Sequence, residues 1–424
     1  MSARVVVTGL GAIAAGGAAP AALWQAAHDG RSAIRPAAEA AASPRPFAGE
    51  IADFDPRRLV SDRKLHARIG RTDFFGLFAS AAAIDDARLL TARERLPADE
   101  ANAFNEATGV FAGAGGATYQ NQYDFLPVLA ATGGDLGAFG REVSSAVTPM
   151  WLLRSLPNNV LCHVGIRYGF KGPNSCLTSH AASGALALVD ALDAVREGTA
   201  ERAVVVAHDA PIEAETLFHL HSLGLLARDA VRPFDSKRDG MLLGEGAAAM
   251  ILESEASAAG RGARVIGEIL GGGAAGDAEG LIELRQDGAG IALAIEQALA
   301  DAGVEPRDVG LVVAHGEGTP ASDRAEASAI LHAFGGSPPP VTAFKWSFGH
   351  AFAASALLDV VLALESLGRG CAPGIATLRE SAFPELPVSP IPRPPRSEIA
   401  LVLARGFGGL SSAIVVRGLP ETPP

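Results

Sequence analysis

The sequence predicts an α/β fold made of two similar halves. The composition combines 48% hydrophobic residues with 19% charged residues and 49 glycines, which is typical of a buried sheet covered by small-residue helices. Strand-like apolar runs alternate with stretches of helical spacing, which favours a largely parallel sheet. Because 424 residues are many for one core and the alternation restarts near Ala263, we expect halves at 1–255 and 256–424. No strong internal sequence repeat is visible.

The first half opens with a buried strand over residues 5–9. The glycines that follow lack a full dinucleotide fingerprint and are interpreted as a tight turn. In order, the patterns then predict a helix over 20–30, a surface loop over 34–46, a helix over 73–86, a strand over 108–112, and another strand within ERAVVVAHDAP, residues 201–211. The second half has strand-like runs at 265–269, 309–314, 341–344, 399–403 and 413–416.

The stretch GPNSCLTSHAASG, residues 172–184, predicts a strand that turns sharply into an alanine-rich helix. Residue 181 should therefore lie at a helix N-terminus, where free N–H groups and the helix dipole stabilise a thiolate or an oxyanion. This chain has Ala181 there, so the turn resembles a catalytic elbow without a nucleophile.

Three stretches of the second half carry potentially reactive groups. His315 follows a strand, Lys345 and His350 lie where a strand passes into a helix, and a glycine loop contains Gly406, Gly408 and Gly409. A single histidine is more often structural than catalytic, but loops beyond the ends of parallel strands form sites. We therefore expect these stretches to converge on the elbow. His219 and His221 have no third ligand at metal spacing, so no metal site is predicted.

The bulk properties exclude several classes of protein. A net charge of −12 argues against nucleic-acid binding, and three scattered cysteines indicate a reducing, cytoplasmic setting. No run reads as a secretory signal or a membrane span. A basic cluster, expected on a helix, is either a solvated helix face or a landing site for an acidic partner; it contains Arg63, Lys64, Arg68 and Arg71.

Taken together, the motifs resemble the β-ketoacyl-acyl-carrier-protein synthases, the type I/II condensing enzymes of fatty-acid and polyketide synthesis. The resemblance covers nearly the whole chain, and it rests, in the family's order, on VVVTGLGAI, LPNNVLCHVGIRYGFKGPN, the elbow, RPFDSKRDGMLLGEGAA, HGEGTP, KWSFGH and GFGG. It implies a thiolase-like fold with two similar β-α-β-rich halves in alternating α/β/α/β/α layers. It also implies a homodimer, or a heterodimer with a related ketosynthase.

The resemblance also implies roles for individual residues. The family's acyl-accepting cysteine falls at Ala181, and two histidines that bind the malonyl thioester carbonyl fall at His315 and His350. Lys345 would support them, and the remaining substrate-binding positions are Thr319, Glu317, His180, Phe407 and Gly408, with Phe407 in a gating loop. The substrate would arrive on the phosphopantetheine of an acyl carrier protein, without a bound cofactor. Carrier proteins are acidic, so the basic cluster becomes a candidate docking face.

Three departures from the family pattern leave several hypotheses open. Alanine cannot form the acyl thioester, His180 is unusual beside the elbow, and Glu317 stands where the family has a threonine. The chain is interpreted first as a natural nucleophile-less member, which decarboxylates malonyl-carrier protein or serves as a chain-length-factor-like partner of an active ketosynthase. The alternatives are a condensing enzyme with an engineered cysteine-to-alanine change and a purely structural dimer partner.

Overall fold

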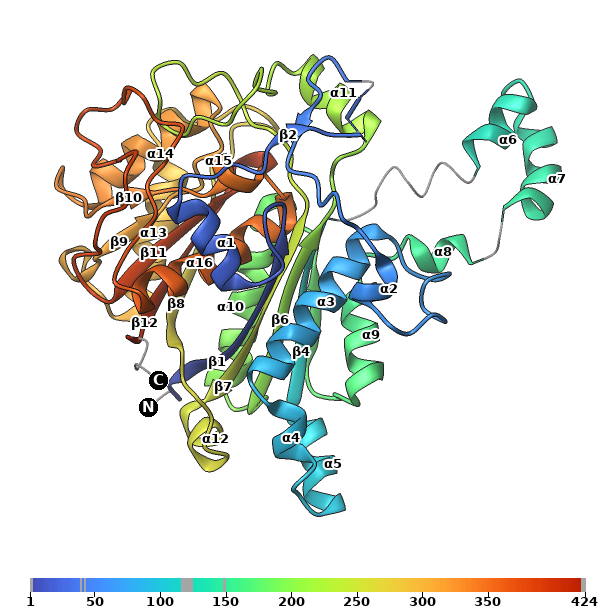
Figure 1. Ribbon diagram of the computed structural model, residues 1–424, viewed down its shortest axis with the longest axis horizontal. Coiled ribbons are helices and arrows are strands. Elements are labelled where there is room, and N and C mark those ends of the chain that lie inside the picture. Colours follow the sequence, from blue (N-terminus) through green and yellow to red (C-terminus); the bar gives the residue numbers. More distant parts are fainter. Residues whose placement is uncertain (1–2, 39, 42, 116–124, 148–149, 421–424) are drawn as a thin grey trace.

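A ten-stranded mixed sheet forms the centre of the computed structural model, which describes residues 3–38, 40–41, 43–115, 125–147 and 150–420 (Figure 1). The first half of the chain contributes β1 (Val5–Ala14), β4 (Thr108–Ala114), β5 (Asn174–Leu177), β6 (Arg202–Asp209) and β7 (Gly246–Ser254). The second half contributes β8 (Gly267–Gly276), β9 (Leu311–Val313), β10 (Val341–Thr342), β11 (Ile399–Arg405) and β12 (Leu410–Gly418). The strand order is β10-β9-β11-β12-β8-β1-β7-β6-β4-β5.

The two halves have the same topology. Numbered within its own half, each group of strands has the order third, second, fourth, fifth, first, and β1 and β8 meet at the centre. In both halves the second strand is parallel to the third and fourth, and the remaining neighbours are antiparallel. The expected pair of similar halves is therefore confirmed.

The expectation of a largely parallel sheet is wrong. Among the described strands, only β4 with β5 and β6, and β9 with β10 and β11, pair in parallel. β11 turns directly into β12 through a short glycine loop, and a two-strand connection of this length can only be antiparallel. Hydrophobic runs predict that a strand is buried, but they carry no information about its direction.

Helices form three layers around the two groups of strands. α3 (Arg71–Asp86) covers the outer face of β1, β6 and β7, and α13 (Ala289–Ala302) covers β8 and β12, with α14 (Pro320–Ala333) packed on it. α10 (Ser183–Arg196) and α16 (Ser355–Gly368) lie between the halves, because both contact strands of each half. The five alternating layers of a thiolase-like fold are thus present.

The other elements connect these layers or project from them. An arm made of α6 (Leu126–Ala131) and α7 (Leu136–Ala146) extends away from the body, and α8 (Trp151–Arg154) lies at the body beside α2 and α9 (Figure 1). The remaining elements are α1 (Pro20–His28), β2 (Arg35–Pro36), β3 (Phe47–Ala48), α2 (Pro56–Leu59), α4 (Leu89–Arg93), α5 (Ala98–Glu106), α9 (Asn159–Tyr168), η2 (His180–Ala182), α11 (Ala214–Ser222), α12 (Glu255–Gly260), η3 (Pro306–Asp308), α15 (Lys345–Phe348), η4 (Phe352–Ala354) and η5 (Phe407–Gly409). A search of the described residues finds no helix with the length and apolarity needed to cross a membrane.

A short internal repeat marks corresponding positions of the two halves. His180-Ala-Ala-Ser183 forms η2 and begins α10, and Phe352-Ala-Ala-Ser355 forms η4 and begins α16. The first residue of each has a positive φ, 52° at His180 and 33° at Phe352, and η2 packs against η4. Only the structure makes four residues recognisable as a repeat, because it shows that both copies follow the third strand of their half.

The glycines of the first strand do not form the tight turn that the sequence suggested. β1 continues to Ala14, and Gly9 and Gly11 lie under α3. A Cβ atom at Gly9 would lie 2.3 Å from the carbonyl oxygen of Ala83, and one at Gly11 would lie 2.1 Å from that of Ala79. These glycines therefore allow the helix backbone to approach the strand closely.

Candidate active site

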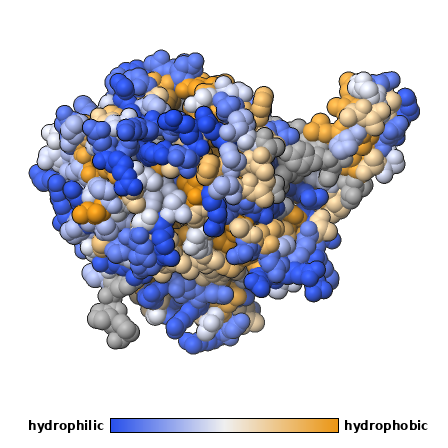
Figure 2. Space-filling model, turned by 45° about the horizontal axis from the view of Figure 1, so that its top comes forward, coloured by the Kyte–Doolittle hydropathy of each residue, from blue (hydrophilic) through white to orange (hydrophobic). Residues whose placement is uncertain are grey.

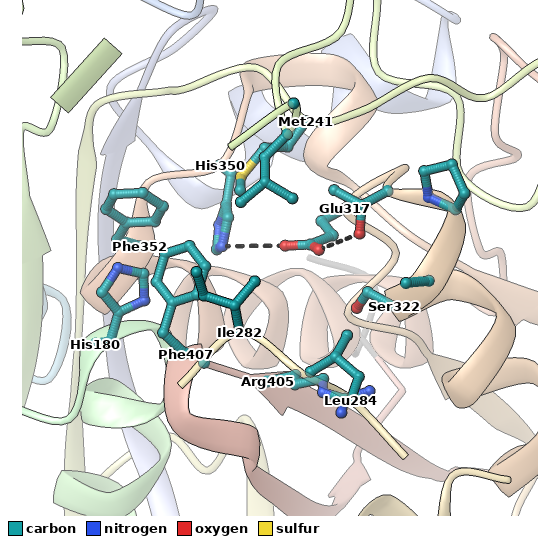
Figure 3. A pocket seen from close by; sticks show the side chains of 16 residues that line it. His180, Met241, Ile282, Leu284, Glu317, Ser322, His350, Phe352, Arg405 and Phe407 are labelled. Carbon is teal, nitrogen blue, oxygen red and sulfur yellow. Dashed lines mark hydrogen bonds and ion pairs between the residues drawn. The ribbon is translucent and has the colours of Figure 1, made fainter. Parts of the chain in front are cut away.

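A cavity of about 240 Å³ lies where loops of the two halves meet (Figure 3). The elbow contributes His180, the loops after β9 and α15 contribute Glu317 and His350, and the loop after β11 contributes Phe407. The strand ends and loops that the sequence singled out are thus close together. Apolar side chains form much of the remaining wall, including Leu225, Met241, Ile282 and Leu284.

The elbow has the local geometry expected from its sequence. β5 ends at Leu177, and Ala181 lies in η2, immediately before α10, with 1% of its surface exposed. The hydroxyl of Ser183 accepts a hydrogen bond from the Ser179 N–H (2.7 Å) and donates to the His180 carbonyl (2.6 Å). The Ser183 hydroxyl therefore fixes the turn that places residue 181 at the start of the helix.

Two side chains near Ala181, Ser183 and Cys176, are poor substitutes for a nucleophilic thiol. Ser183 is fully buried, and its hydroxyl is engaged within the turn. Burial raises the pKa of Cys176 to about 11, and its Sγ lies 3.6 Å from the Pro157 carbonyl oxygen. A thiol with so high a pKa is almost entirely protonated at neutral pH and is a poor nucleophile.

His315 and His350 form a buried pair of imidazoles whose ring centroids are 5.0 Å apart. The Arg405 backbone N–H donates to His315 Nδ1 at 3.3 Å, so in the neutral ring the proton is on Nε2. His350 Nδ1 lies 2.9 Å from the Ser355 hydroxyl. Burial, with the positive charge of Lys345 as a further cause, holds the pKa of both imidazoles well below the ordinary histidine value. Both rings are therefore neutral at physiological pH.

The Glu317 carboxylate lies between these two imidazoles. Its Oε2 is 3.3 Å from His315 Nε2. The same oxygen is 4.0 Å from His350 Nε2 (Figure 3), and Oε1 accepts a hydrogen bond of 2.6 Å from the Thr319 hydroxyl. The space toward which the Nε2 atoms of both rings point is thus filled by a side chain of the protein itself.

The same three side chains are close enough to be considered as metal ligands. Single donor atoms of His315, Glu317 and His350 all lie within 4.8 Å of one another. A metal on His315 Nε2 would place a proton on Nδ1, which faces the Arg405 N–H, a second donor. The contacts of His315 therefore fit a hydrogen-bonded carboxylate better than a metal ion.

Two buried carboxylates of α14 hold the loop that carries His315 and Glu317. Glu326 accepts hydrogen bonds from the backbone N–H groups of His315 (2.6 Å) and Gly316 (2.9 Å). Asp323 accepts from Gly318 (3.0 Å) and from Phe234 (2.7 Å). The first turns of α14 thus determine where the loop between β9 and the helix lies.

We expect Glu326 to make stability depend on pH. Burial raises the pKa of Glu326 from 4.5 to about 7 in the folded protein. Its contribution to the free energy of unfolding is therefore fully present below pH 4.5, the pKa of the unfolded chain, and is lost as the pH rises to about 7. The unfolding free energy of the wild type, from urea denaturation, should fall relative to that of Glu326→Gln between about pH 5 and pH 8, by roughly 2 kcal/mol. A difference between the two proteins that does not change with pH would contradict this.

Lys345 lies behind the cavity and does not line it. Its Nζ is 2.8 Å from Asp359 Oδ2, and both side chains are completely buried. Burial raises the pKa of Asp359 to about 6, and Lys345 opposes that shift. Lys345 thus contacts Asp359 rather than the cavity and acts on the two histidines through its charge.

His180 lies between two aromatic rings at the cavity wall. Its ring centroid is 4.2 Å from that of Phe352 and 4.7 Å from that of Phe407. Burial lowers its pKa to about 4, and its Nδ1 has no hydrogen-bond partner among the described residues. Phe407 precedes Gly408, whose φ of 77° requires glycine and whose N–H donates to the Leu281 carbonyl at 2.8 Å.

Sequence reasoning missed several residues of the cavity wall. Phe352 contacts both His180 and His350, with ring centroids 5.0 Å apart in the second pair. Arg405 also lines the cavity and forms a buried ion pair with Asp277. Phe352 could have been found through the repeat of HAAS as FAAS, but nothing in the sequence connects Arg405 to Asp277.

The basic cluster is not helical as expected. Arg63, Lys64 and Arg68 are exposed in a series of turns before α3, where the Asp62 carboxylate accepts the Lys64 N–H and favours a turn over a helix. Arg71 begins α3, and it forms an ion pair with the buried Glu245 (2.6 Å) and stacks on Phe54. The structure therefore separates Arg71 from the three exposed cations.

Comparison with known families and structures gives consistent results. The family model of the beta-ketoacyl synthase N-terminal domain matches residues 2–258, and that of the C-terminal domain matches residues 266–379. A 3-oxoacyl-(acyl-carrier-protein) synthase 2 of Synechocystis is 33% identical, with 96% of each chain covered.

Two solved structures are similar over the whole chain. The ishigamide ketosynthase/chain length factor has a TM-score of 0.86 and 28% identity, covering 99% of this chain and 100% of the other. A type II PKS acyl-carrier protein in complex with its ketosynthase contains a chain with a TM-score of 0.83, 25% identity and the same coverage.

Proposed function

Because the chain belongs to the β-ketoacyl synthase family, we propose that it serves as a nucleophile-less partner of an active ketosynthase in carrier-protein-dependent chain assembly. In this role it resembles a chain length factor: it shapes the assembly and its cavity, while the partner forms the acyl-enzyme bond. The observation that carries this proposal is Ala181.

In this proposal Ala181 takes the place of the family's acyl-accepting group. It lies at the start of a helix, almost completely buried, beside a cavity that is otherwise well formed. A methyl group cannot attack a thioester, and the nearby Ser183 and Cys176 are hydrogen-bonded or strongly protonated. Condensation by an acyl-enzyme on this chain alone is therefore disfavoured.

Two further departures support a natural member over an engineered one. His180 packs between Phe352 and Phe407, and Glu317 is held by Thr319 and His315. Both side chains are integrated into the cavity wall, and a single cysteine-to-alanine change would not produce them.

The arm offers a surface for the partner subunit. Its helices contain no buried residue among those described, and they expose apolar side chains such as Leu136, with 73% of its surface accessible. Ile166 on the neighbouring helix α9 is 77% exposed. Figure 2 shows apolar side chains over the projecting arm. An apolar surface of this kind is typical of a protein interface.

The acyl carrier protein is the second proposed partner. Arg63, Lys64 and Arg68 present exposed positive charges on a protein with a net charge of −12, which suits an acidic carrier. Its phosphopantetheine would deliver the acyl group, so no cofactor of the chain's own is proposed. Two similar proteins, the Synechocystis synthase and the type II PKS ketosynthase complex, are named for an acyl carrier protein.

Malonyl decarboxylation is a second candidate function. The retained imidazole pair, 5.0 Å between ring centroids, favours it, since two neutral N–H donors can stabilise charge on a thioester oxygen. The Glu317 carboxylate between them opposes it.

The test compares the protein alone with the protein in the presence of a cysteine-bearing ketosynthase. Alone with malonyl-loaded carrier protein, it should release no carbon dioxide and gain no acyl mass. With the ketosynthase it should form a stable complex on size exclusion and change the length distribution of the products. Leu136→Asp on the arm should weaken that complex at least tenfold, whereas Leu293→Asp, at an exposed position of α13, should not.

Two other results of this experiment would count against the proposal. Loss of carbon dioxide catalysed by the lone protein would favour the decarboxylase. No complex, and no effect on the products, would argue against the partner role.

A further inference from the structure

We propose that Glu317 determines the ligand specificity of the cavity. Its carboxylate takes the acceptor position between His315 and His350, and leaves the cavity selective for uncharged acyl groups over carboxylated ones. The inference concerns this chain's own cavity and does not depend on the partner, so it can fail while the proposed function stands.

The two imidazoles define a position for a hydrogen-bond acceptor, and a side chain of the protein itself fills it. The His315 Nε2–H is directed toward Glu317 Oε2 because its Nδ1 already accepts the Arg405 N–H. His350 Nε2 lies 4.0 Å from the same oxygen. A carbonyl or carboxylate oxygen of a ligand could reach this position only by displacing Glu317.

Glu317 is held in that position from the other side. The Thr319 hydroxyl donates to Oε1 at 2.6 Å, and the backbone around both residues is fixed by the buried carboxylates of α14. Displacing the side chain would break a charge-assisted hydrogen bond at each carboxylate oxygen.

The charges around the cavity also favour an uncharged ligand. Arg405 is paired with Asp277, and the pKa of all three cavity histidines is lowered by burial, so these groups contribute little net charge. Glu317 then adds a negative charge beside walls formed by Leu225, Met241, Ile282 and Leu284 (Figure 3). An uncharged acyl chain suits such walls, whereas the carboxylate of a malonyl group would be repelled in a site of low dielectric constant.

The test measures binding of two pantetheine thioesters, octanoyl and malonyl, to the whole protein by calorimetry. In the wild type we expect octanoyl-pantetheine to bind at least tenfold more tightly. Glu317→Thr should lower this preference at least tenfold, mainly by tightening malonyl binding. Glu283→Thr, the same charge change on an exposed loop residue beside the cavity, should leave the preference unchanged.

A second measurement tests, without a thioester, whether a small carboxylate can fill the position of the Glu317 side chain. Sodium acetate should raise the melting temperature of Glu317→Thr, and not that of the wild type, because it refills the vacated position. Adding His315→Ala to that variant should abolish the acetate effect. An equal preference in wild type and Glu317→Thr would overturn the proposal, as would the absence of any acetate effect on a folded Glu317→Thr protein.

Discussion

Replacing Ala181 by cysteine is expected to give this chain a covalently bound acyl group. The new thiol would lie at the start of η2 and α10, where the helix N-terminus favours the thiolate. The thiolate attacks the carbonyl of an acyl-carrier thioester, and the bond between that carbonyl and the pantetheine sulfur breaks. The pantetheine sulfur takes up the proton that the new thiol released, and the acyl group stays on residue 181. We expect a change from no labelling to roughly one acyl group per chain, measured as intact mass after incubation with octanoyl-loaded carrier protein.

A cysteine one residue further on provides the matched control. Ala182 is fully buried in the same turn, so Ala182→Cys introduces the same thiol one residue away from the position that the elbow places at the helix start. This variant should stay unlabelled. A folded Ala181→Cys protein that gains no acyl mass would mean that His180 and Glu317 have altered the site beyond the loss of its nucleophile.

Replacing Lys345 by methionine is expected to destabilise the protein by about 3–5 kcal/mol. Lys345 and Asp359 are completely buried and 2.8 Å apart, so the substitution leaves an uncompensated carboxylate in the core. The free energy of unfolding, from urea denaturation at neutral pH, measures the loss. Lys237→Met at an exposed position should change it by less than about 0.5 kcal/mol.

The pH dependence of this defect identifies its cause. Asp359 has a pKa raised to about 6 by burial, and without Lys345 the carboxyl would be protonated still more readily. Its protonated form carries no charge to compensate, so the deficit of Lys345→Met should shrink as the pH is lowered to about 5. Adding Asp359→Leu should restore most of the stability at neutral pH. A deficit that is the same at all pH values would indicate lost packing instead of a stranded charge.

The sequence predicted the elements of the fold better than their arrangement. The five strand-like runs of the second half correspond to β8 to β12, because buried strands leave compact apolar runs between turn residues. The close approach of α3 to Gly9 and Gly11 depends on contacts between residues about 70 positions apart, and the direction of β1 against β7 depends on pairs more than 230 positions apart. Local patterns carry no information about such contacts.

The residues of the cavity were partly predictable for the same reason. His315, His350 and the elbow lie at strand ends or at helix starts, positions that a sequence reveals. The place of Glu317 depends on the Thr319 hydroxyl, and the loop around it depends on two carboxylates of α14. For the basic cluster the sequence predicted a helix where the structure has turns. A local Asx turn at Asp62 takes the place of the helix there.

The HAAS and FAAS turns have a consequence for how the two halves share their work. Ala181 and Ala353 occupy corresponding places just before the two central helices, so both turns carry a methyl group at the same position. The titratable side chains between the two turns and the cavity come mainly from the second half: His315, Glu317 and His350. At residues 181 and 353 the halves are therefore chemically alike. A single substitution at residue 181 would make them different again without altering the backbone pattern that the two halves share.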